Sequence, residues 1–145
     1  MSEIVKLDNI RVCVDALDSK DSIYKAGQLL IDNGSITQEY IDDMWKSVIE
    51  LGPYMVLMPG FALAHSAPCP AVLKTDISLI TLKNPINFGS DNDPVKVVMC
   101  LACVDKEQHM SSIQQIAMKL MRDGIIDEMV ECKTPEELHK LINEG

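Results

Sequence analysis

Two apolar segments near the middle of the chain constrain its fold more than any other feature. Residues 77–82 read ISLITL and residues 97–104 read VVMCLACV, so each segment is apolar on both faces. Both have the length of a strand, and a strand that is apolar on both faces needs helices above and below its sheet. The sequence therefore predicts a three-layer α/β/α sandwich with a mixed central sheet.

The remaining strands are shorter. Residues 10–16 alternate in polarity, which predicts a strand near a sheet edge. Its apolar face is expected to hold Ile10, Val12, Val14 and Ala16. Residues 54–65 are mostly apolar but broken by Pro59 and Gly60, so we expect two short strands, the second ending near His65. Residues 83–94 carry two prolines and a glycine and predict a long ordered loop.

Helical periodicity fills the rest of the chain. The first helix is expected over residues 22–33 with Gly34 as its stop, and the second over residues 37–51. The inward stripe of the second helix is predicted to be Ile41, Met44, Val48 and Leu51. A third helix begins at Asp105, which pairs with Gln108 in a capping box. Its buried stripe is predicted to be Met110, Ile113, Ala117, Leu120 and Met121. Residues 125–130 and a segment opened by Pro135 predict two more helices.

Length and charge narrow the function. The 145 residues fit one domain, and a net charge of −9 argues against a nucleic-acid or anionic-membrane surface. The N-terminus does not resemble a signal peptide, and no apolar run is long enough to span a membrane. Five cysteines without a signal peptide indicate reduced thiols and a cytoplasmic protein. The chain ends without a linker, so we expect a free-standing subunit.

The cysteines do not predict a metal site. Cys100 and Cys103 lie three apart in a predicted strand, so their side chains point to opposite faces and are expected to be buried. Cys69 lies between two prolines near His65 and is a weaker candidate for a reactive thiol. The chain has no GxGxxG, Walker A or GxSxG motif, so we expect no nucleotide cofactor and no metal.

His65 is the first candidate for chemistry. It ends an apolar strand and precedes the small residues Ser66 and Ala67, which leave room for a partner. One interpretation is a core histidine bonded to a backbone carbonyl. The other is a nucleophilic imidazole that carries a covalent group.

His109 lies in the first turn of the third helix, directly after the longest buried strand. The helix dipole disfavours imidazolium there, and a neutral imidazole can still donate one N–H to an anion. The alternative is a partly exposed helix residue. His65 and His109 each follow a strand, and if those strands are neighbours the two side chains line one site. His139 is expected to be a solvated helix residue.

Residues 51–68, LGPYMVLMPGFALAHSAP, resemble the active-site region of enzyme IIA of the bacterial phosphoenolpyruvate-dependent sugar phosphotransferase system, fructose–mannitol type. Four later blocks agree in order and spacing: residues 74–82 (KTDISLITL), 85–89 (PINFG), 92–95 (NDPV) and 101–109 (LACVDKEQH). The resemblance covers nearly the whole chain, is most similar to the ascorbate-type branch, and implies a single enzyme IIA domain over residues 1–145.

The resemblance implies a phosphocarrier that takes a phosphoryl group from the carrier HPr onto His65. It passes the group to a cysteine of enzyme IIB and meets the membrane only indirectly, through enzyme IIC. His109 is then the residue that supports the phosphoryl group, and the Ser66 hydroxyl is a further candidate donor. The chain departs from the common pattern at Ala64, where Pro is usual, and at Ala67, where Arg is usual.

Two alternatives to sugar transport share this fold. A regulatory enzyme IIA-like module would use His65 phosphorylation to signal to a protein partner. A non-catalytic binding domain would never be phosphorylated, and the presence of both His65 and His109 argues against it.

Overall fold

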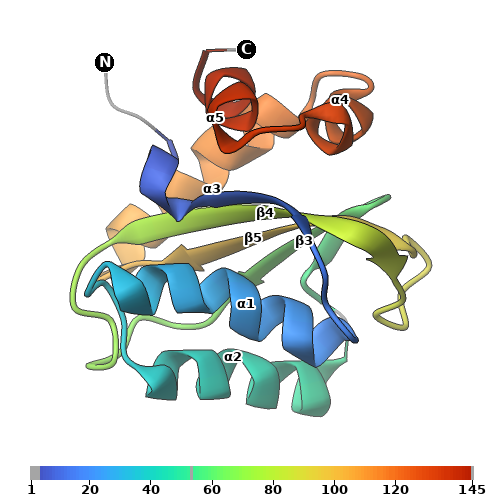
Figure 1. Ribbon diagram of the computed structural model, residues 1–145. Helices are drawn as coiled ribbons and strands as arrows, with labels where there is room; N and C mark the ends of the chain where they lie inside the picture. Colours follow the sequence, from blue (N-terminus) through green and yellow to red (C-terminus); the bar gives the residue numbers. More distant parts are fainter. Residues whose placement is uncertain (1–3, 53, 145) are drawn as a thin grey trace.

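The computed structural model describes residues 4–52 and 54–144 and contains one five-stranded sheet (Figure 1). The strands are β1 (Ile10–Val14), β2 (Val56–Met58), β3 (Phe61–His65), β4 (Asp76–Ile86) and β5 (Val95–Ala102). Their order across the sheet is β1-β4-β5-β3-β2. β1 runs parallel to β4 and β3 parallel to β5, while β4–β5 and β2–β3 are antiparallel. The predicted mixed sheet is confirmed, with β1 at an edge.

Helices cover both faces of this sheet. One layer contains α1 (Ser19–Asp32) and α2 (Gln38–Leu51), and the other contains α3 (Lys106–Leu120), α4 (Ile125–Glu131) and α5 (Pro135–Glu144) (Figure 1). Successive residues of β5 contribute to different cores, because strand side chains alternate between faces. Val98 and Cys100 pack toward α1 and α2, whereas Met99 and Leu101 pack on the side of α3 to α5. The three-layer sandwich is therefore the observed fold.

The expected facing of residues 10–16 is wrong at both Val14 and Ala16. Ile10 and Val12 pack into the core under α3 to α5, but Val14 packs against the core on the opposite side. The face changes at Cys13, whose φ of 53° lies in the left-handed region, and the register with β4 shifts there. The Cys13 N–H donates to the Thr81 hydroxyl instead of continuing the ladder. A bulge of this kind reverses the facing of every later residue in the strand.

The predicted buried stripes of the second and third helices are also partly wrong. Leu51, Met110 and Met121 are 71%, 58% and 80% exposed, and Ala117 is exposed as well. In α3 the residues facing the sheet are Ile116 and Leu120, with Ile113 partly buried. The helix is thus rotated about its axis relative to the predicted stripe, which leaves its methionines outside.

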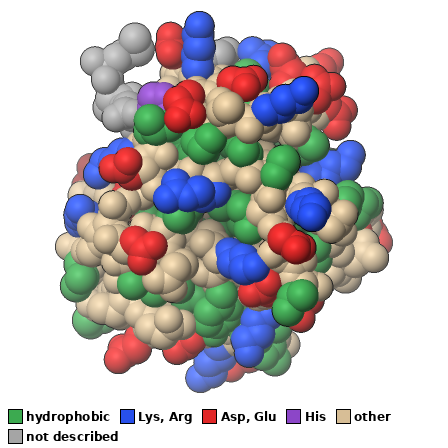
Figure 2. Space-filling view, viewed as in Figure 1, with side chains coloured by type: hydrophobic (Ala, Val, Ile, Leu, Met, Phe, Trp, Pro, Cys, Tyr) green, Lys and Arg blue, Asp and Glu red, His purple; other side chains and the backbone are tan. Residues whose placement is uncertain are grey.

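A further difference concerns the loop that follows β4. β4 continues through Pro85 to Ile86, so the expected long loop is confined to residues 87–94. None of the helices in the described part of the chain is long and apolar enough to cross a membrane. Acidic side chains gather over α4 and α5 at the top of Figure 2.

Candidate functional site

The two histidines of interest meet at the carboxyl ends of two adjacent parallel strands. His65 is the last residue of β3 and pairs with Leu101 of β5. The chain leaves β5 at Ala102 and enters α3 at Lys106, which brings His109 back over the sheet. The two imidazole centroids lie 5.6 Å apart. The prediction that both side chains line one site is confirmed in its geometry.

His65 is held in one tautomer by its own strand. Its Nδ1 lies 2.8 Å from the carbonyl oxygen of Leu63, two residues earlier. A carbonyl can only accept, so Nδ1 carries the hydrogen, and in the neutral ring the lone pair is then on Nε2. The ring is half-buried. The backbone therefore leaves Nε2 as the nucleophilic nitrogen of this side chain.

Two tyrosines surround the backbone at His65. The Tyr54 hydroxyl donates to the His65 carbonyl oxygen at 3.0 Å, and its ring meets the imidazole edge-on at a centroid distance of 5.5 Å. The Tyr40 hydroxyl accepts from the Ser66 N–H at 3.0 Å and donates to the Leu101 carbonyl oxygen at 2.8 Å. Tyr40 is fully buried. These bonds satisfy the backbone polar groups where β3 and β5 end.

His109 is turned inward by the rotation of α3. At 100° per residue, His109 lies on the same helix face as Ile113, Ile116 and Leu120. Its Nε2 is buried and has no hydrogen-bond partner among the described residues. Burial lowers the pKa of His109, and the nearby His65 lowers it further. His109 is therefore a neutral imidazole with one unused polar atom beside His65.

A cavity of about 530 Å³ opens where these side chains meet. Ser66 and Lys106 contribute polar groups to its lining, and Leu51 and Met110 contribute exposed apolar ones. The full lining is Ser47, Leu51, Tyr54, His65, Ser66, Ala67, Pro68, Lys106, His109 and Met110. Among the described residues of this lining, Lys106 is the one cation and none is a carboxylate. The cavity therefore suits a negatively charged group bordered by an apolar surface.

The other candidates from the sequence lie apart from this cavity. His139 is half-buried in α5. Cys69 is half-buried, and its sulfur lies 4.0 Å from a carboxylate oxygen of Asp43. Cys100 and Cys103 are buried in the two different cores, as expected, and burial raises the pKa of the Cys100 thiol to about 12. The described residues contain no cluster of three side chains able to hold a metal ion.

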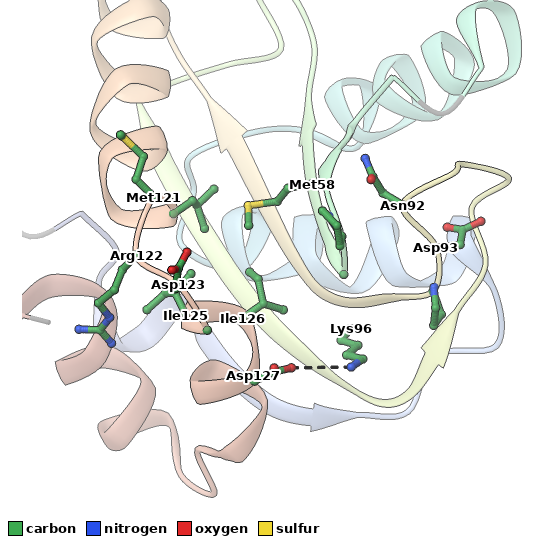
Figure 3. Close-up of a pocket in the computed structure, with 15 residues that line it drawn as sticks. Met58, Asn92, Asp93, Lys96, Met121, Arg122, Asp123, Ile125, Ile126 and Asp127 are labelled. Carbon is green, nitrogen blue, oxygen red and sulfur yellow. Dashed lines mark ion pairs between the residues drawn. The ribbon is translucent and has the colours of Figure 1, made fainter.

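A second cleft, of about 360 Å³, lies beside Gly60 at the amino end of β3 (Figure 3). It is bordered by the β2–β3 turn, by residues 92–94 and by the turn between α3 and α4. Lys96 pairs with Asp127 across it at 3.8 Å. Asp93 is occupied as an acceptor for three backbone N–H groups of the preceding loop. The described residues that line it include neither histidine nor cysteine, so the cavity that contains His65 is the better candidate.

Sequence reasoning missed three members of the site. Tyr40 and Tyr54 look like ordinary core residues in the sequence, because their partners lie 11 to 61 residues away. Lys106 could have been predicted from the sequence, because it is the first residue of the helix that also contains His109. Lys106 lines the same cavity as His65.

Comparison with known proteins shows the family of the chain. Residues 3–145 match the family described as phosphoenolpyruvate-dependent sugar phosphotransferase system, EIIA 2. The chain is 33% identical to an ascorbate-specific PTS system EIIA component of Shigella flexneri, over 93% of this chain and 89% of the relative. The solution structure of the mannitol-specific cryptic phosphotransferase enzyme IIA of Escherichia coli superposes with a TM-score of 0.88 at 28% identity, covering 98% and 97% of the two chains. The enzyme IIA chain in an Escherichia coli complex with phosphorylated mannitol enzyme IIB shares the fold, with a TM-score of 0.83 at 21% identity and coverage of 95% and 96%.

Proposed function

The chain belongs to the EIIA 2 family of the phosphoenolpyruvate-dependent sugar phosphotransferase system, and from this premise we propose that His65 is its phosphoryl acceptor. The protein is a phosphotransferase component of the enzyme IIA class. In the proposed reaction, phospho-HPr donates the group to His65 and a cysteine of enzyme IIB receives it. The single observation that carries the assignment is the Nδ1 bond of His65 to the Leu63 carbonyl, which leaves Nε2 free.

Each transfer exchanges one bond to phosphorus for another. The Nε2 lone pair of His65 attacks the phosphorus of phospho-HPr, and the P–N bond to the donor histidine breaks as the new P–N bond forms. In the second transfer a cysteine thiolate of enzyme IIB attacks, and the bond to His65 Nε2 breaks. Such transfers depend on in-line placement and charge stabilisation more than on further covalent chemistry.

His109 is the proposed stabiliser of the phosphoryl group. Its ring lies next to His65, and its buried Nε2 has no partner among the described residues. A neutral imidazole with a hydrogen on the nitrogen nearer the cavity would donate it to a phosphoryl oxygen. The Ser66 hydroxyl and the Lys106 ammonium are further proposed contacts, because both groups line the same cavity.

The surroundings of His65 support a protein partner rather than a small substrate. Leu51 and Met110 line the cavity and are mostly exposed. Met118 in α3 and Met121 just after it are exposed as well. Exposed apolar side chains next to a reactive group favour transient protein docking. We expect HPr and enzyme IIB to use this surface in turn, on the cytoplasmic side of the membrane, with residues 1–145 acting as one domain.

The proposed transport substrate is ascorbate or a related pentose or polyol. This rests on similarity, since one of the relatives is named as ascorbate-specific and another as mannitol-specific. Enzyme IIC binds the sugar, so the enzyme IIB and IIC partners will decide the substrate.

The test is the mass of the intact protein after incubation with phosphoenolpyruvate, enzyme I and HPr. We expect one added phosphoryl group that is labile in acid and stable in base. It should require HPr, disappear in His65→Ala and persist in His139→Ala, the matched control. Chase with enzyme IIB should remove the group and label the enzyme IIB cysteine.

Three results would separate the alternatives. No adduct on the wild type with competent HPr would overturn the carrier role and leave a binding module. An adduct that persists in His65→Ala would move the acceptor elsewhere. A stable adduct on His65 that no enzyme IIB accepts would favour the regulatory module.

A further inference from the structure

Two tyrosine hydroxyls hold the two ends of a single peptide bond, the one between His65 and Ser66. Tyr54 donates to the carbonyl oxygen of this peptide, and Tyr40 accepts from its N–H, both at 3.0 Å. Tyr40 comes from α2, and Tyr54 lies in the connection between α2 and β2. Two side chains therefore hold the peptide that directly follows the imidazole, at the last residue of β3 in the ladder.

The Tyr40 hydroxyl also joins the two strands that end at the site. It donates its proton to the Leu101 carbonyl at 2.8 Å, a shorter contact than its 3.2 Å approach to the Ser66 carbonyl. Its acceptor side holds the Ser66 N–H. The end of β3 and the end of β5 are therefore linked through one buried hydroxyl, at the register position where His65 pairs with Leu101.

Both hydroxyls must keep their protons to act in this way. Burial raises the pKa of Tyr54 and, more strongly, that of Tyr40. Neither phenol ionises near neutral pH, so neither is suited to accept a proton in a reaction. Their geometry fits a role in holding the His65–Ser66 peptide in place.

We infer that Tyr40 and Tyr54 are positioning residues that fix the His65–Ser66 peptide and thereby aim His65 Nε2 into the cavity. The inference rests on the proposed role of His65. Three contacts restrain the imidazole: its Nδ1 bond to the Leu63 carbonyl, and the two bonds to the peptide behind it. Loss of one contact frees the peptide to rotate, which misplaces the nucleophile relative to the incoming phosphorus.

The test uses the full-length variants Tyr40→Phe and Tyr54→Phe. Each removes one hydroxyl and keeps the ring. Tyr24→Phe is the matched control, because the Tyr24 hydroxyl bonds to Asp42 on the surface, outside the cavity. Tyr54 is only partly buried, so Tyr54→Phe keeps the test open if loss of the buried Tyr40 hydroxyl prevents folding.

Two measurements distinguish positioning from simple stability. The first is the single-turnover rate of transfer from phospho-HPr at 25 °C, as a function of donor concentration. We expect the saturating rate to fall about tenfold in each variant, with less than a twofold change in the half-saturating concentration. The second is the nitrogen-15 spectrum of the His65 ring, which should change from a single Nδ1–H tautomer to a mixture.

Each outcome decides the inference. Folded variants that keep the wild-type rate and a single tautomer would overturn it, even if they melt earlier. A tenfold loss in Tyr24→Phe would also overturn it, because the effect would then not be specific to the peptide. A wild-type protein that takes no phosphoryl group from phospho-HPr would overturn the proposed function, and this inference would fall with it.

Discussion

His65 and His109 lie at adjacent strand ends, but their surroundings differ. His65 has a backbone acceptor for Nδ1 and two tyrosines that hold the following peptide. His109 has a buried Nε2 with no partner among the described residues, and burial lowers its pKa. One ring is fixed in place, and the other retains an unsatisfied polar atom.

This difference fits two roles in phosphoryl transfer, that of a nucleophile and that of a stabilising hydrogen-bond donor. A nucleophile benefits from a fixed direction, because small displacements of the attacking atom slow the transfer strongly. A stabilising group benefits from a hydrogen-bonding capacity that is unused until charge arrives. An unpartnered buried nitrogen is costly in a resting protein, and an incoming phosphoryl oxygen would remove that cost. The comparison predicts that substitution of each histidine will impair phosphoryl transfer in a different way.

The largest expected effect after loss of His65 itself comes from removal of the second imidazole. His109→Ala should slow phosphoryl transfer to His65 by roughly 100-fold, the usual consequence of losing one preorganised donor. His109→Gln keeps an N–H donor at similar reach and should recover part of the rate. The measurement is the single-turnover rate with phospho-HPr, with phosphorylation of His65 confirmed by mass.

The control is His139→Ala, which removes a histidine outside the cavity. A wild-type rate in His109→Ala would show that the unpartnered nitrogen has no part in transfer. The contrast between the two rings would then be a matter of packing alone.

Much of this arrangement could be predicted from the sequence. The apolar segments that became β4 and β5 required cover on both faces, and the order of elements then predicted a three-layer fold. His65 followed the last short strand and His109 followed the longest buried one, so a site at neighbouring strand ends was expected. The expectation was correct because β3 and β5 are parallel neighbours.

The rotation of α3 could not be predicted in the same way. Met110, Ala117 and Met121 form an apolar stripe as good as the one that faces the sheet, so periodicity did not choose between the two. Tertiary packing chose the stripe containing Ile116 and Leu120, which also turns His109 inward. The tyrosine contacts escaped prediction because they join residues that are distant along the chain.

A second way to sharpen the comparison is to remove the cation of the cavity. Lys106→Gln should slow transfer to His65 about two- to fivefold, since an exposed ammonium contributes modestly to binding an anion. Lys140→Gln in α5 makes the same change in net charge away from the cavity and should leave the rate unchanged. Equal rates for wild type and Lys106→Gln would show that Lys106 does not stabilise the phosphoryl group, which would leave His109 and Ser66 as the proposed donors.

Salt should have a smaller effect. The chain carries a net charge of −9, and four glutamates gather around a groove between α4 and α5, whereas none of the described residues lining the His65 cavity is a carboxylate. Attraction of a donor protein with a basic docking face would therefore act through the overall field at a distance. We expect the second-order rate with phospho-HPr to fall about twofold between low and physiological salt, at an unchanged saturating rate. A rate independent of salt would rule out electrostatic steering.

The smallest expected effect is on the pH dependence of the free energy of unfolding, and it reports on His109 alone. Above the ordinary histidine pKa of 6.5, His109 is neutral in both folded and unfolded chains and contributes no pH dependence. As the pH falls below that value, the unfolded chain binds a proton that the folded one resists, because the pKa of folded His109 is lowered. The free energy of unfolding should therefore decrease more between pH 7 and pH 5 in the wild type than in His109→Gln, as measured by urea unfolding. Identical pH profiles for wild type and variant would mean that the His109 ring is not desolvated by its position over the sheet.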